Sequence, residues 1–432
     1  MNLVQLSWKN LINKPLNLTL SLVLFALGVG LISLLLMLNK QLQENFDKNL
    51  AHIDLVIGAK GSPLQLILSS MYHIDNPTGN MSLKEARPFL RPGHPLIKKA
   101  VPLSIGDSYK GYRIVGTTHD ILDLYGGHIA VGQLWQRPLE VTAGAGVARA
   151  LGLRVGDTFK SSHGLIMDDN LVHDDAHSLH IVGILAPTGT VLDQLLLTAP
   201  QTVWAVHEHD ASESPDTHEH EHDHDHEHDH EHSADTTQTD LLQSLLEAPE
   251  DKEITSVLLQ FKSRNFQALN MGRNINENTD LLAATPAIEL NRLHLQMDLG
   301  TKALNILAWV IVFVSGLSVF ISLYASLKDR KYELALMRVM GASPGKIFFL
   351  ILLEGLILAT LGYLAGTLVG HLGMEILAAF MRDSYRYSFT GLQFLSEEIY
   401  LFAGALAIGF FAALLPAIQA KNTDISETLS NG

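Results

Sequence analysis

Four stretches of the chain are apolar over about twenty residues or more, and polar segments separate them. They cover residues 16–38, 302–327, 347–370 and 399–420. Each is long enough to cross a hydrocarbon core of roughly 30 Å as a helix that rises about 1.5 Å per residue. The sequence therefore predicts a membrane α-helical protein with four transmembrane helices.

The first apolar stretch exceeds the roughly 7 to 15 apolar residues of a secretory signal, and residues 37–41 offer no small-residue cleavage pattern. We interpret it as a retained transmembrane helix. Residues 1–15 precede it and mix apolar and polar positions around Trp8, which favours a short helix in the membrane interface.

The long segment 39–301 changes its pattern every few residues. Strand-like runs separated by Gly, Pro and Asp turn signals occur at 112–116, 139–142, 180–185, 201–206 and 253–259. Helical patterns occur at 145–151 and 266–275, and residues 288–327 contain no Pro. We expect a large α+β domain between spans one and two, with span two starting as a helix before it enters the bilayer.

Basic residues beside the spans set the orientation. The short segment 328–346 is rich in Lys and Arg, Lys9 and Lys14 precede span one, and Lys421 begins the tail 421–432. Because positive loops stay inside, both termini and segment 328–346 are predicted to be cytoplasmic. The α+β domain and the loop 371–398 then lie outside, which for a chain without cysteine fits a bacterial periplasm.

The net charge of −15 is local. Eleven Asp and Glu and no Lys or Arg lie in 207–232, so the rest of the chain carries only −4. Few apolar residues occur in 207–240, which we interpret as a disordered insertion in a loop. No basic or aromatic pattern points to nucleic acid.

Alternating imidazoles and carboxylates in this insertion suit Zn²⁺ or another transition metal, because alternate side chains of an extended chain project to the same side. The alternative is a hydrated spacer that collects metal incidentally. The candidate ligands are His207, His209, His218, His220, His222, His224, His226, His228, His230 and His232, with weaker candidates at His173, His177 and His180. No tightly bound cofactor is expected.

Three motifs resemble one family. They are LSWKNL with KPL before span one, KDRKYELALMRVMGASPGKI at 328–347 and LLPAIQAKNTDISETL at 414–429. They are similar to ABC transporter permeases of the MacB/FtsX/LolC type, the four-span mechanotransmission family. The resemblance implies a cytoplasmic ABC ATPase dimer on the coupling segment, a second permease subunit forming a homodimer, and a periplasmic or lipoprotein partner.

The coupling segment has two helical faces, both partly apolar. One carries Tyr332, Ala335, Leu336, Val339 and Met340. We assign the ATPase contact to the other, which carries Arg330, Glu333, Leu334, Met337 and Arg338. A plain amphipathic connector is the alternative.

No ATPase or other enzyme is recognisable in the chain. GASPGKI at 341–347 lacks one residue between its glycines and the Ser or Thr of a phosphate loop, so ATP is expected on a partner chain. Glu354 inside span three is interpreted as a structural contact rather than a substrate relay. Gly362, Gly366 and Gly370 repeat every four residues and predict close helix packing.

These features favour the permease subunit of an ABC transporter, with a link to zinc or other transition-metal homeostasis through the histidines. Two alternatives remain open within the family. The protein could be a signalling subunit that controls a periplasmic hydrolase, or a lipoprotein-release permease in which the histidine tract is an incidental spacer. A metal store or sensor is a third.

Overall fold

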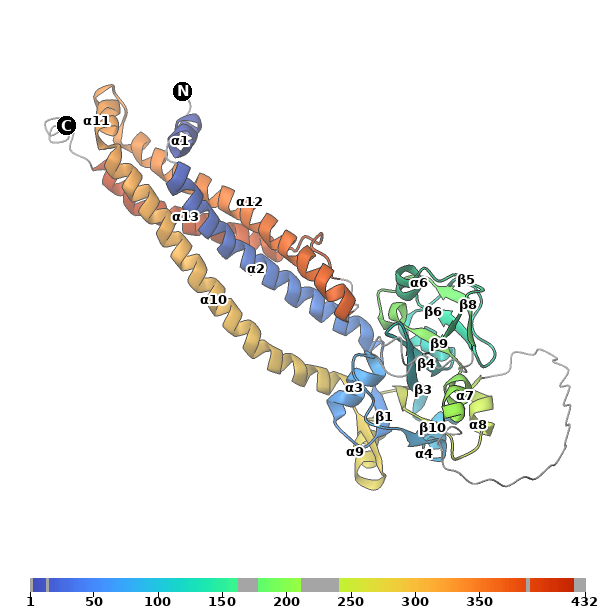
Figure 1. Cartoon of the computed structure of the whole chain (residues 1–432). Helices are drawn as coiled ribbons and strands as arrows, with labels where there is room; N and C mark the ends of the chain where they lie inside the picture. The colour runs from blue at the N-terminus through green and yellow to red at the C-terminus, as the bar shows by residue number, and fades with distance from the viewer. Residues whose placement is uncertain (1–2, 13–14, 162–177, 211–240, 386–388, 423–432) are drawn as a thin grey trace, which may run out of the picture. The chain divides into compact units, whose positions relative to one another are not determined.

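The structure is a computed structural model that describes residues 3–12, 15–161, 178–210, 241–385 and 389–422. The chain divides into two compact units. Unit 1 comprises Met1–Glu44 and His294–Gly432, and unit 2 comprises Asn45–Leu293. This division confirms a helical membrane part with an α+β part between its first and second spans (Figure 1).

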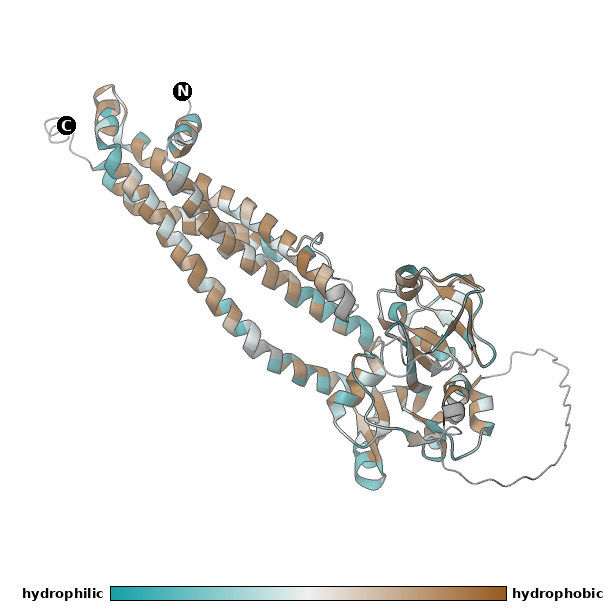
Figure 2. Ribbon diagram, in the orientation of Figure 1, coloured by the Kyte–Doolittle hydropathy of each residue, from teal (hydrophilic) through white to brown (hydrophobic). Residues whose placement is uncertain are grey.

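Unit 1 is built from long apolar helices, coloured predominantly brown in Figure 2. Within the described residues, four helices are long and apolar enough to cross a membrane, and they match the four predicted spans. The helices that lie wholly or mostly in this unit are α1 (Leu3–Ile12), α2 (Pro15–Leu50), α10 (Pro286–Asp329), α11 (Lys331–Val339), α12 (Pro344–Tyr385) and α13 (Glu397–Lys421).

Two of these helices are longer than the apolar pattern indicates. Helix α2 continues to Leu50 and α12 to Tyr385, so most of the predicted loop 371–398 is helical. Helix α10 begins at Pro286, which confirms that span two starts well before its apolar stretch. Its first-turn proline has the fixed φ and the missing N–H that suit a helix start.

Unit 2 contains a ten-stranded mixed sheet within the described residues, in the order β12-β1-β11-β3-β4-β9-β6-β8-β5, with β7 paired to β8. Its pairs are antiparallel except β4 with β9 and β6 with β8. The strands are β1 (Leu55–Ala59), β3 (Ile97–Tyr109), β4 (Tyr112–Thr117), β5 (Ile129–Gly132), β6 (Glu140–Ala143), β7 (Thr158–Lys160), β8 (Ser178–Leu185), β9 (Leu196–Thr198), β11 (Ser256–Phe261) and β12 (Leu281–Ala284).

Strands β3 and β4 form a hairpin across the pair Tyr109–Tyr112. The two turn residues, Lys110 and Gly111, both have positive φ, which matches the right-handed twist of the flanking strands. A separate two-stranded sheet pairs β2 (Met81–Ser82) with β10 (Glu253–Ile254).

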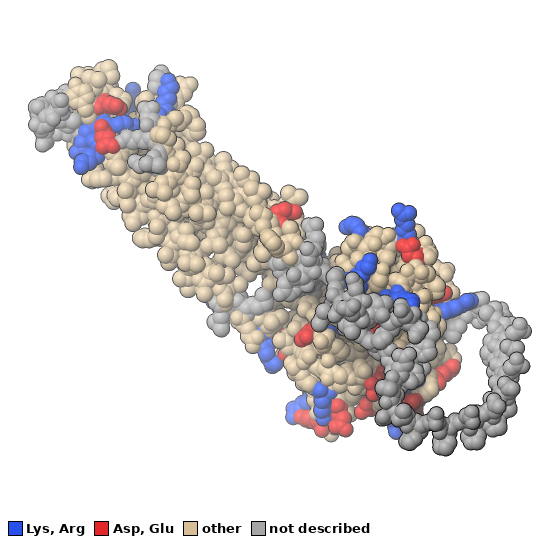
Figure 3. Space-filling model, viewed as in Figure 1, with Lys and Arg blue, Asp and Glu red and all other residues tan. Residues whose placement is uncertain are grey.

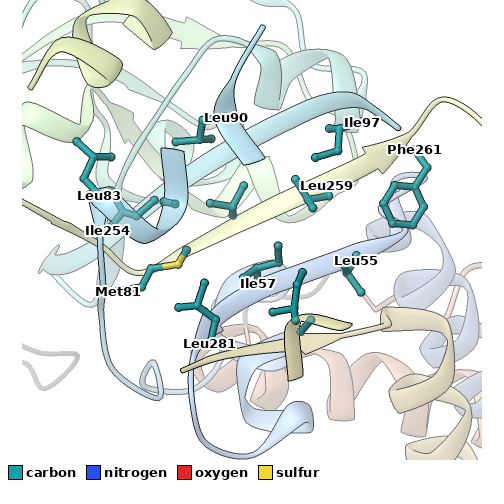
Figure 4. Packing of buried hydrophobic residues seen from close by; sticks show 14 of the residues in the cluster. Leu55, Ile57, Met81, Leu83, Leu90, Ile97, Ile254, Leu259, Phe261 and Leu281 are labelled. Carbon is teal, nitrogen blue, oxygen red and sulfur yellow. The ribbon is translucent and has the colours of Figure 1, made fainter. Parts of the chain in front are cut away.

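Short helices accompany the sheets: α3 (Pro63–Met71), α4 (Leu83–Leu90), α5 (Asp120–Tyr125), α6 (Ala145–Leu151), a 3-10 turn η2 (Val191–Gln194), α7 (Pro200–Asp210), α8 (Leu241–Glu247) and α9 (Phe266–Asn278). Apolar side chains of β1, β11 and β12 pack with those of α4, as Figure 4 shows around Ile57 and Leu259. A second core unites α6 with β4, β6, β8 and β9. The predicted α+β class is therefore confirmed.

The prediction of a strand at 201–206 is wrong, because these residues lie in α7. Pro200 occupies the first position of the helix, and Thr202 is buried with its hydroxyl accepting a hydrogen bond from Leu139 N at 2.9 Å. Tertiary packing thus outweighs the β propensity of Thr, Val and Trp. The predicted insertion 207–240 begins within this helix, and its residues 211–240 lie outside the described residues.

Candidate functional site

The coupling helix α11 lies between α10 and α12. Leu334 N donates to Arg330 O at 3.0 Å at its start. At its end, Ala342 N donates to Met337 O at 3.0 Å, and Gly341 has a φ of +98°, which glycine adopts without strain. Helix α12 follows at Pro344, whose fixed φ and missing N–H suit the first turn of a helix.

One face of α11 packs into unit 1. Leu334 is 5% exposed and Ala335 is 1% exposed. Leu334 belongs to a buried cluster, against which Met337 packs, and the cluster comprises Leu327, Leu334, Ile347, Leu350, Ile351, Ala417 and Ala420. This packing joins α11 to α10, α12 and α13.

The opposite face of α11 is apolar and exposed. Tyr332, Leu336, Val339 and Met340 are 52%, 45%, 59% and 72% exposed. This arrangement corrects the assignment of Leu334 and Met337 to a partner contact, because their side chains pack within unit 1. Helical periodicity separates the two faces but cannot say which one the bundle covers.

Of the remaining residues assigned to that contact, Glu333 is exposed and Arg338 is half-buried. Arg330 is engaged inside unit 1. Its two terminal nitrogens donate to the two carboxylate oxygens of Glu354 at 3.3 Å and 3.1 Å, and one of them also contacts the Ser326 hydroxyl. A bidentate guanidinium–carboxylate pair fixes geometry more tightly than a single contact.

Glu354 is buried at the centre of this contact. The side-chain amide of Asn10 donates to its Oε1 at 2.9 Å, and Ser7 of the same helix donates to Leu350 O at 3.3 Å. A cavity of about 20 Å³ lies beside the carboxylate, between Asn10, Ser322 and Ser326, and has room for one water molecule. Glu354 lies in α12 and therefore connects this helix both to α1, through Asn10, and to the start of α11, through Arg330.

Asn10 is a functional candidate that sequence analysis did not single out. It is one of several polar residues of α1, whose Val4, Trp8 and Ile12 are exposed on the other side. The amphipathic pattern indicates a polar side but does not indicate a buried carboxylate opposite it.

The three predicted packing glycines all contact α2. A Cβ on Gly362 would lie 2.5 Å from a ring carbon of Phe25, and one on Gly370 would lie 2.8 Å from Gly30 O. A Cβ on Gly366 would lie 2.7 Å from Val29 Cβ. These separations are too short for any side chain larger than hydrogen, so the close approach of α2 and α12 depends on glycine.

The structure describes only some of the predicted metal ligands. His180 is exposed in β8, and the backbone of His207 and His209 lies in the last turn of α7. His173, His177 and the histidines from 218 to 232 lie outside the described residues. Among the residues that the structure describes, no three His, Cys, Asp or Glu side chains are grouped to hold a metal ion.

Charged side chains of unit 1 gather at the end that carries α1 and α11, whereas the middle of the bundle shows none on the face in Figure 3. The exposed lysines of these segments are Lys9 of α1, Lys421 at the end of α13, and Lys328, Lys331 and Lys346 in and around α11. The exposed apolar face of α11 thus has charged neighbours, unlike the uninterrupted apolar surface of the spans.

Comparison with known proteins gives one family. The family described as "FtsX-like permease C-terminal" matches residues 305–425. The matched region contains most of α10 and all of α11, α12 and α13. No curated protein matches the chain.

Proposed function

We propose that the chain is the permease subunit of an ABC transporter whose ATPase is a separate chain, on the premise that its residues 305–425 match the FtsX-like permease C-terminal family. The ATPase docks on α11. Hydrolysis of ATP by that partner moves α11, and the motion passes through unit 1 to the domain formed by unit 2.

The exposed apolar face of α11 carries this proposal. A simple connector between two membrane helices gains nothing from exposing Tyr332, Leu336, Val339 and Met340 next to lysines. Contiguous exposed apolar surface rimmed by polar residues is typical of a protein-binding site. The buried face of the same helix, with Leu334 in the bundle, lets a force on α11 reach the spans without a flexible joint.

The Arg330–Glu354 pair supports the same mechanism. It lies where α10 ends and α11 begins, and Asn10 brings α1 to the same carboxylate. Because the pair is bidentate and buried, displacement of α11 either carries Glu354 and α12 with it or breaks the contact. We propose that the pair makes α11 and the spans move together.

Helices α2 and α10 provide the path towards unit 2. Both continue as helices beyond their apolar parts, α2 to Leu50 and α10 from Pro286. Within unit 2 the end of α2 is well attached, since Asn49 Oδ1 accepts from Val191 N at 2.7 Å and Tyr72 donates to Phe46 O at 3.1 Å. A movement of α2 would therefore be transmitted to two separate segments of unit 2, one at Val191 and one at Tyr72.

We place the protein in a bacterial inner membrane with both termini cytoplasmic and unit 2 periplasmic. The support is the concentration of Lys and Arg in 328–346. A reporter inserted at Ala342 should be cytoplasmic, and one within 233–239 should be periplasmic. The reverse pattern would contradict the proposed orientation.

A second copy of the chain is proposed to complete the permease. The apolar window of α10 is the least buried of the four candidate spans. A groove of about 370 Å³ between α10 and α13 is lined by Trp309, Phe313, Phe320 and Phe411 with smaller apolar residues. A second subunit can cover this surface, and lipid is the alternative occupant.

We further propose that the histidine tract binds Zn²⁺ or a similar ion and links the transporter to metal homeostasis. Ten histidines that alternate with carboxylates between His207 and His232 support this step. The neighbouring helices also support an accessory role, because Gln201 of α7 donates to Ser244 of α8 at 3.0 Å and the two ends of the insertion thereby meet in a folded region.

Purification of the intact membrane complex, followed by mass spectrometry of proteins and metals, tests the proposal. We expect an ABC ATPase in amounts comparable to the permease, together with bound zinc or a similar metal. A periplasmic hydrolase in the complex would favour the signalling function, and a lipoprotein would favour lipoprotein release. Absence of any ABC ATPase would contradict the proposed function.

A further inference from the structure

A second buried carboxylate, Glu398, lies far along the chain from the coupling helix. It occupies the first turn of α13 and is 0% exposed. Ser33 of α2 donates to its Oε1 at 2.7 Å, and His371 Nε2 of α12 lies 3.0 Å from the same oxygen. Its other oxygen, Oε2, is buried without a hydrogen-bond partner. Three helices therefore converge on a carboxyl group that none of the proposed steps uses.

The hydrogen-bond partners of His371 determine how many protons this pair holds. His371 Nδ1 contacts Gly391 O, which can only accept, so Nδ1 must carry a hydrogen. Nε2 faces Oε1 of Glu398, and two lone pairs would face each other there unless one proton lies between them. The pair must therefore hold one proton, either as imidazolium and carboxylate or as imidazole and carboxylic acid.

Among the side chains that the structure describes, none with a fixed positive charge forms an ion pair with Glu398 in place of that proton. Among the described residues, His371 is the basic side chain within ion-pair distance of Glu398. The other facing groups are the Tyr363 hydroxyl, which donates to Glu398 O at 3.2 Å, the Ser33 hydroxyl and the carboxylate of Glu375 next to Gly391. A deprotonated pair would leave a buried negative charge without a cation, which is unfavourable in a site closed to water.

The same histidine holds the loop between α12 and α13, residues 389–396. Besides contacting Gly391 O, its ring stacks on Phe394 with centroids 5.2 Å apart. Glu375 accepts from Gly391 N at 2.6 Å, and the side-chain amide of Gln41 pairs with Thr390 N and O at 2.9 and 2.7 Å. The loop is thus attached to α2 and α12 by polar contacts that meet at Gly391 and Thr390.

We infer that His371 and Glu398 form a binding site for a single proton, and that this proton keeps the 389–396 loop attached to α2 and α12. After loss of the proton as the pH rises, the neutral imidazole keeps one hydrogen and can donate either to Oε1 of Glu398 or to Gly391 O, but not to both. That hydrogen moves to Nε2, which faces the buried carboxylate, and His371 then releases Gly391 and Phe394. A second proton, taken up in acid, leaves Nε2–H donating to Oε1, so the loop stays attached at low pH. The switch therefore acts in one direction only.

The absence of cysteine from the chain allows a direct test. Leu392→Cys places a single spin label on the loop, at a side chain that is 88% exposed. The full-length protein in lipid nanodiscs is followed by electron paramagnetic resonance from pH 5 to 10. We expect the mobile fraction to increase with pH as a one-proton transition, in which the ratio of mobile to immobile label changes roughly tenfold per pH unit.

Two variants identify the group responsible. Glu398→Gln can turn its amide NH2 towards Nε2 and donate to the neutral imidazole, with the Ser33 hydroxyl as an acceptor, so no shared proton is needed and its label should stay immobile over the whole range. Glu397→Gln changes an exposed neighbour and should titrate like the parent. If Glu398→Gln does not insert, His371→Asn should likewise lose the transition. A parent label whose mobility is constant from pH 5 to 10, or a Glu398→Gln variant that titrates like the parent, would overturn the inference. No ATPase takes part, so this outcome is separate from that of the proposed function.

Discussion

Gly366→Ala should separate α2 from α12, although it adds a single methyl group. The new Cβ would lie 2.7 Å from Val29 Cβ, 2.8 Å from Val29 Cγ1 and 2.9 Å from Ala26 O. Ordinary carbon contacts need at least about 3.4 Å, so the helices must move apart by roughly 0.7 Å. Val29 Cβ and Ala26 O are attached to the α2 backbone and cannot turn aside as the tip of a long side chain could.

The expected cost follows from packing. Inserting a methyl group into a close-packed contact destabilises a protein by about 1–3 kcal/mol. The loss is reduced by the higher helix propensity of Ala, which contributes up to about 1 kcal/mol. Gly404→Ala is a matched control, because its new Cβ would meet nothing within 4 Å. This variant therefore gains helix propensity without a steric clash.

Thermal unfolding of both variants in the same nanodiscs measures the difference. For a unit of this size we expect Gly366→Ala to lower the midpoint on the order of 5 °C relative to Gly404→Ala. Equal midpoints for the two variants would show that α2 and α12 do not touch through Gly366, and the assigned helix packing would be wrong.

Three other properties can be tested on the same protein. Arg330→Met leaves Glu354 buried without its cation and should destabilise unit 1 by about 3–5 kcal/mol in thermal unfolding, whereas Arg330→Met with Glu354→Met should recover most of the loss; equal instability of both variants would contradict this. Burial, and then Arg113, lower the pKa of His73 from 6.5 to about 3, so its contribution to stability is complete above pH 6.5 and is lost as the pH falls towards 3. Tryptophan fluorescence should therefore show a shallower acid dependence of unit 2 stability for His73→Asn, a residue that tolerates the positive φ, and an unchanged slope would refute the assignment. Replacement of the ten histidines from His207 to His232 by Asn should remove most bound metal while leaving the melting midpoint unchanged; unchanged metal content would make the tract a spacer.

Apolar periodicity was sufficient to predict the spans but not the helix ends. Residues such as Gln41 and Asn49 lie in the polar continuation of α2, where hydropathy no longer indicates a helix. Gln41 pairs with Thr390 and Asn49 with Val191, so both are held by residues distant in sequence. Such contacts stabilise a helix beyond the point where the local pattern predicts its end.

The error at α7 has a similar origin. Its residues Thr202, Val203 and Trp204 have β propensity, which makes a strand the local preference. The helix forms because Thr202 is buried beside Leu139 and the indole of Trp204 donates to Glu253 O at 2.7 Å. The Pro200 start signal was present in the sequence and favoured the helix.

The candidate site was predicted in part. Helical periodicity predicts two faces of α11, and the acidic residue inside span three singles out Glu354. Neither pattern indicates on which side of α11 the other helices of unit 1 lie. The burial of Leu334 and the exposure of Met340 depend on where α10, α12 and α13 lie. Asn10 is 344 positions and Arg330 is 24 positions from Glu354 in the sequence, so the fold must bring these segments together before either residue can bind Glu354.

The most direct test of the proposed function places charge on the exposed face of α11. Leu336→Asp with Met340→Asp puts two carboxylates where the ATPase is proposed to bind, and burying them against an apolar partner is strongly unfavourable. The control, Phe266→Asp with Leu269→Asp, makes the same kind of change on the exposed helix α9 of unit 2. We predict that the α11 variant inserts and melts like the parent but loses the co-purifying ATPase, whereas the α9 variant keeps it. Retention of the ATPase at parental levels by the α11 variant would contradict the proposed docking face.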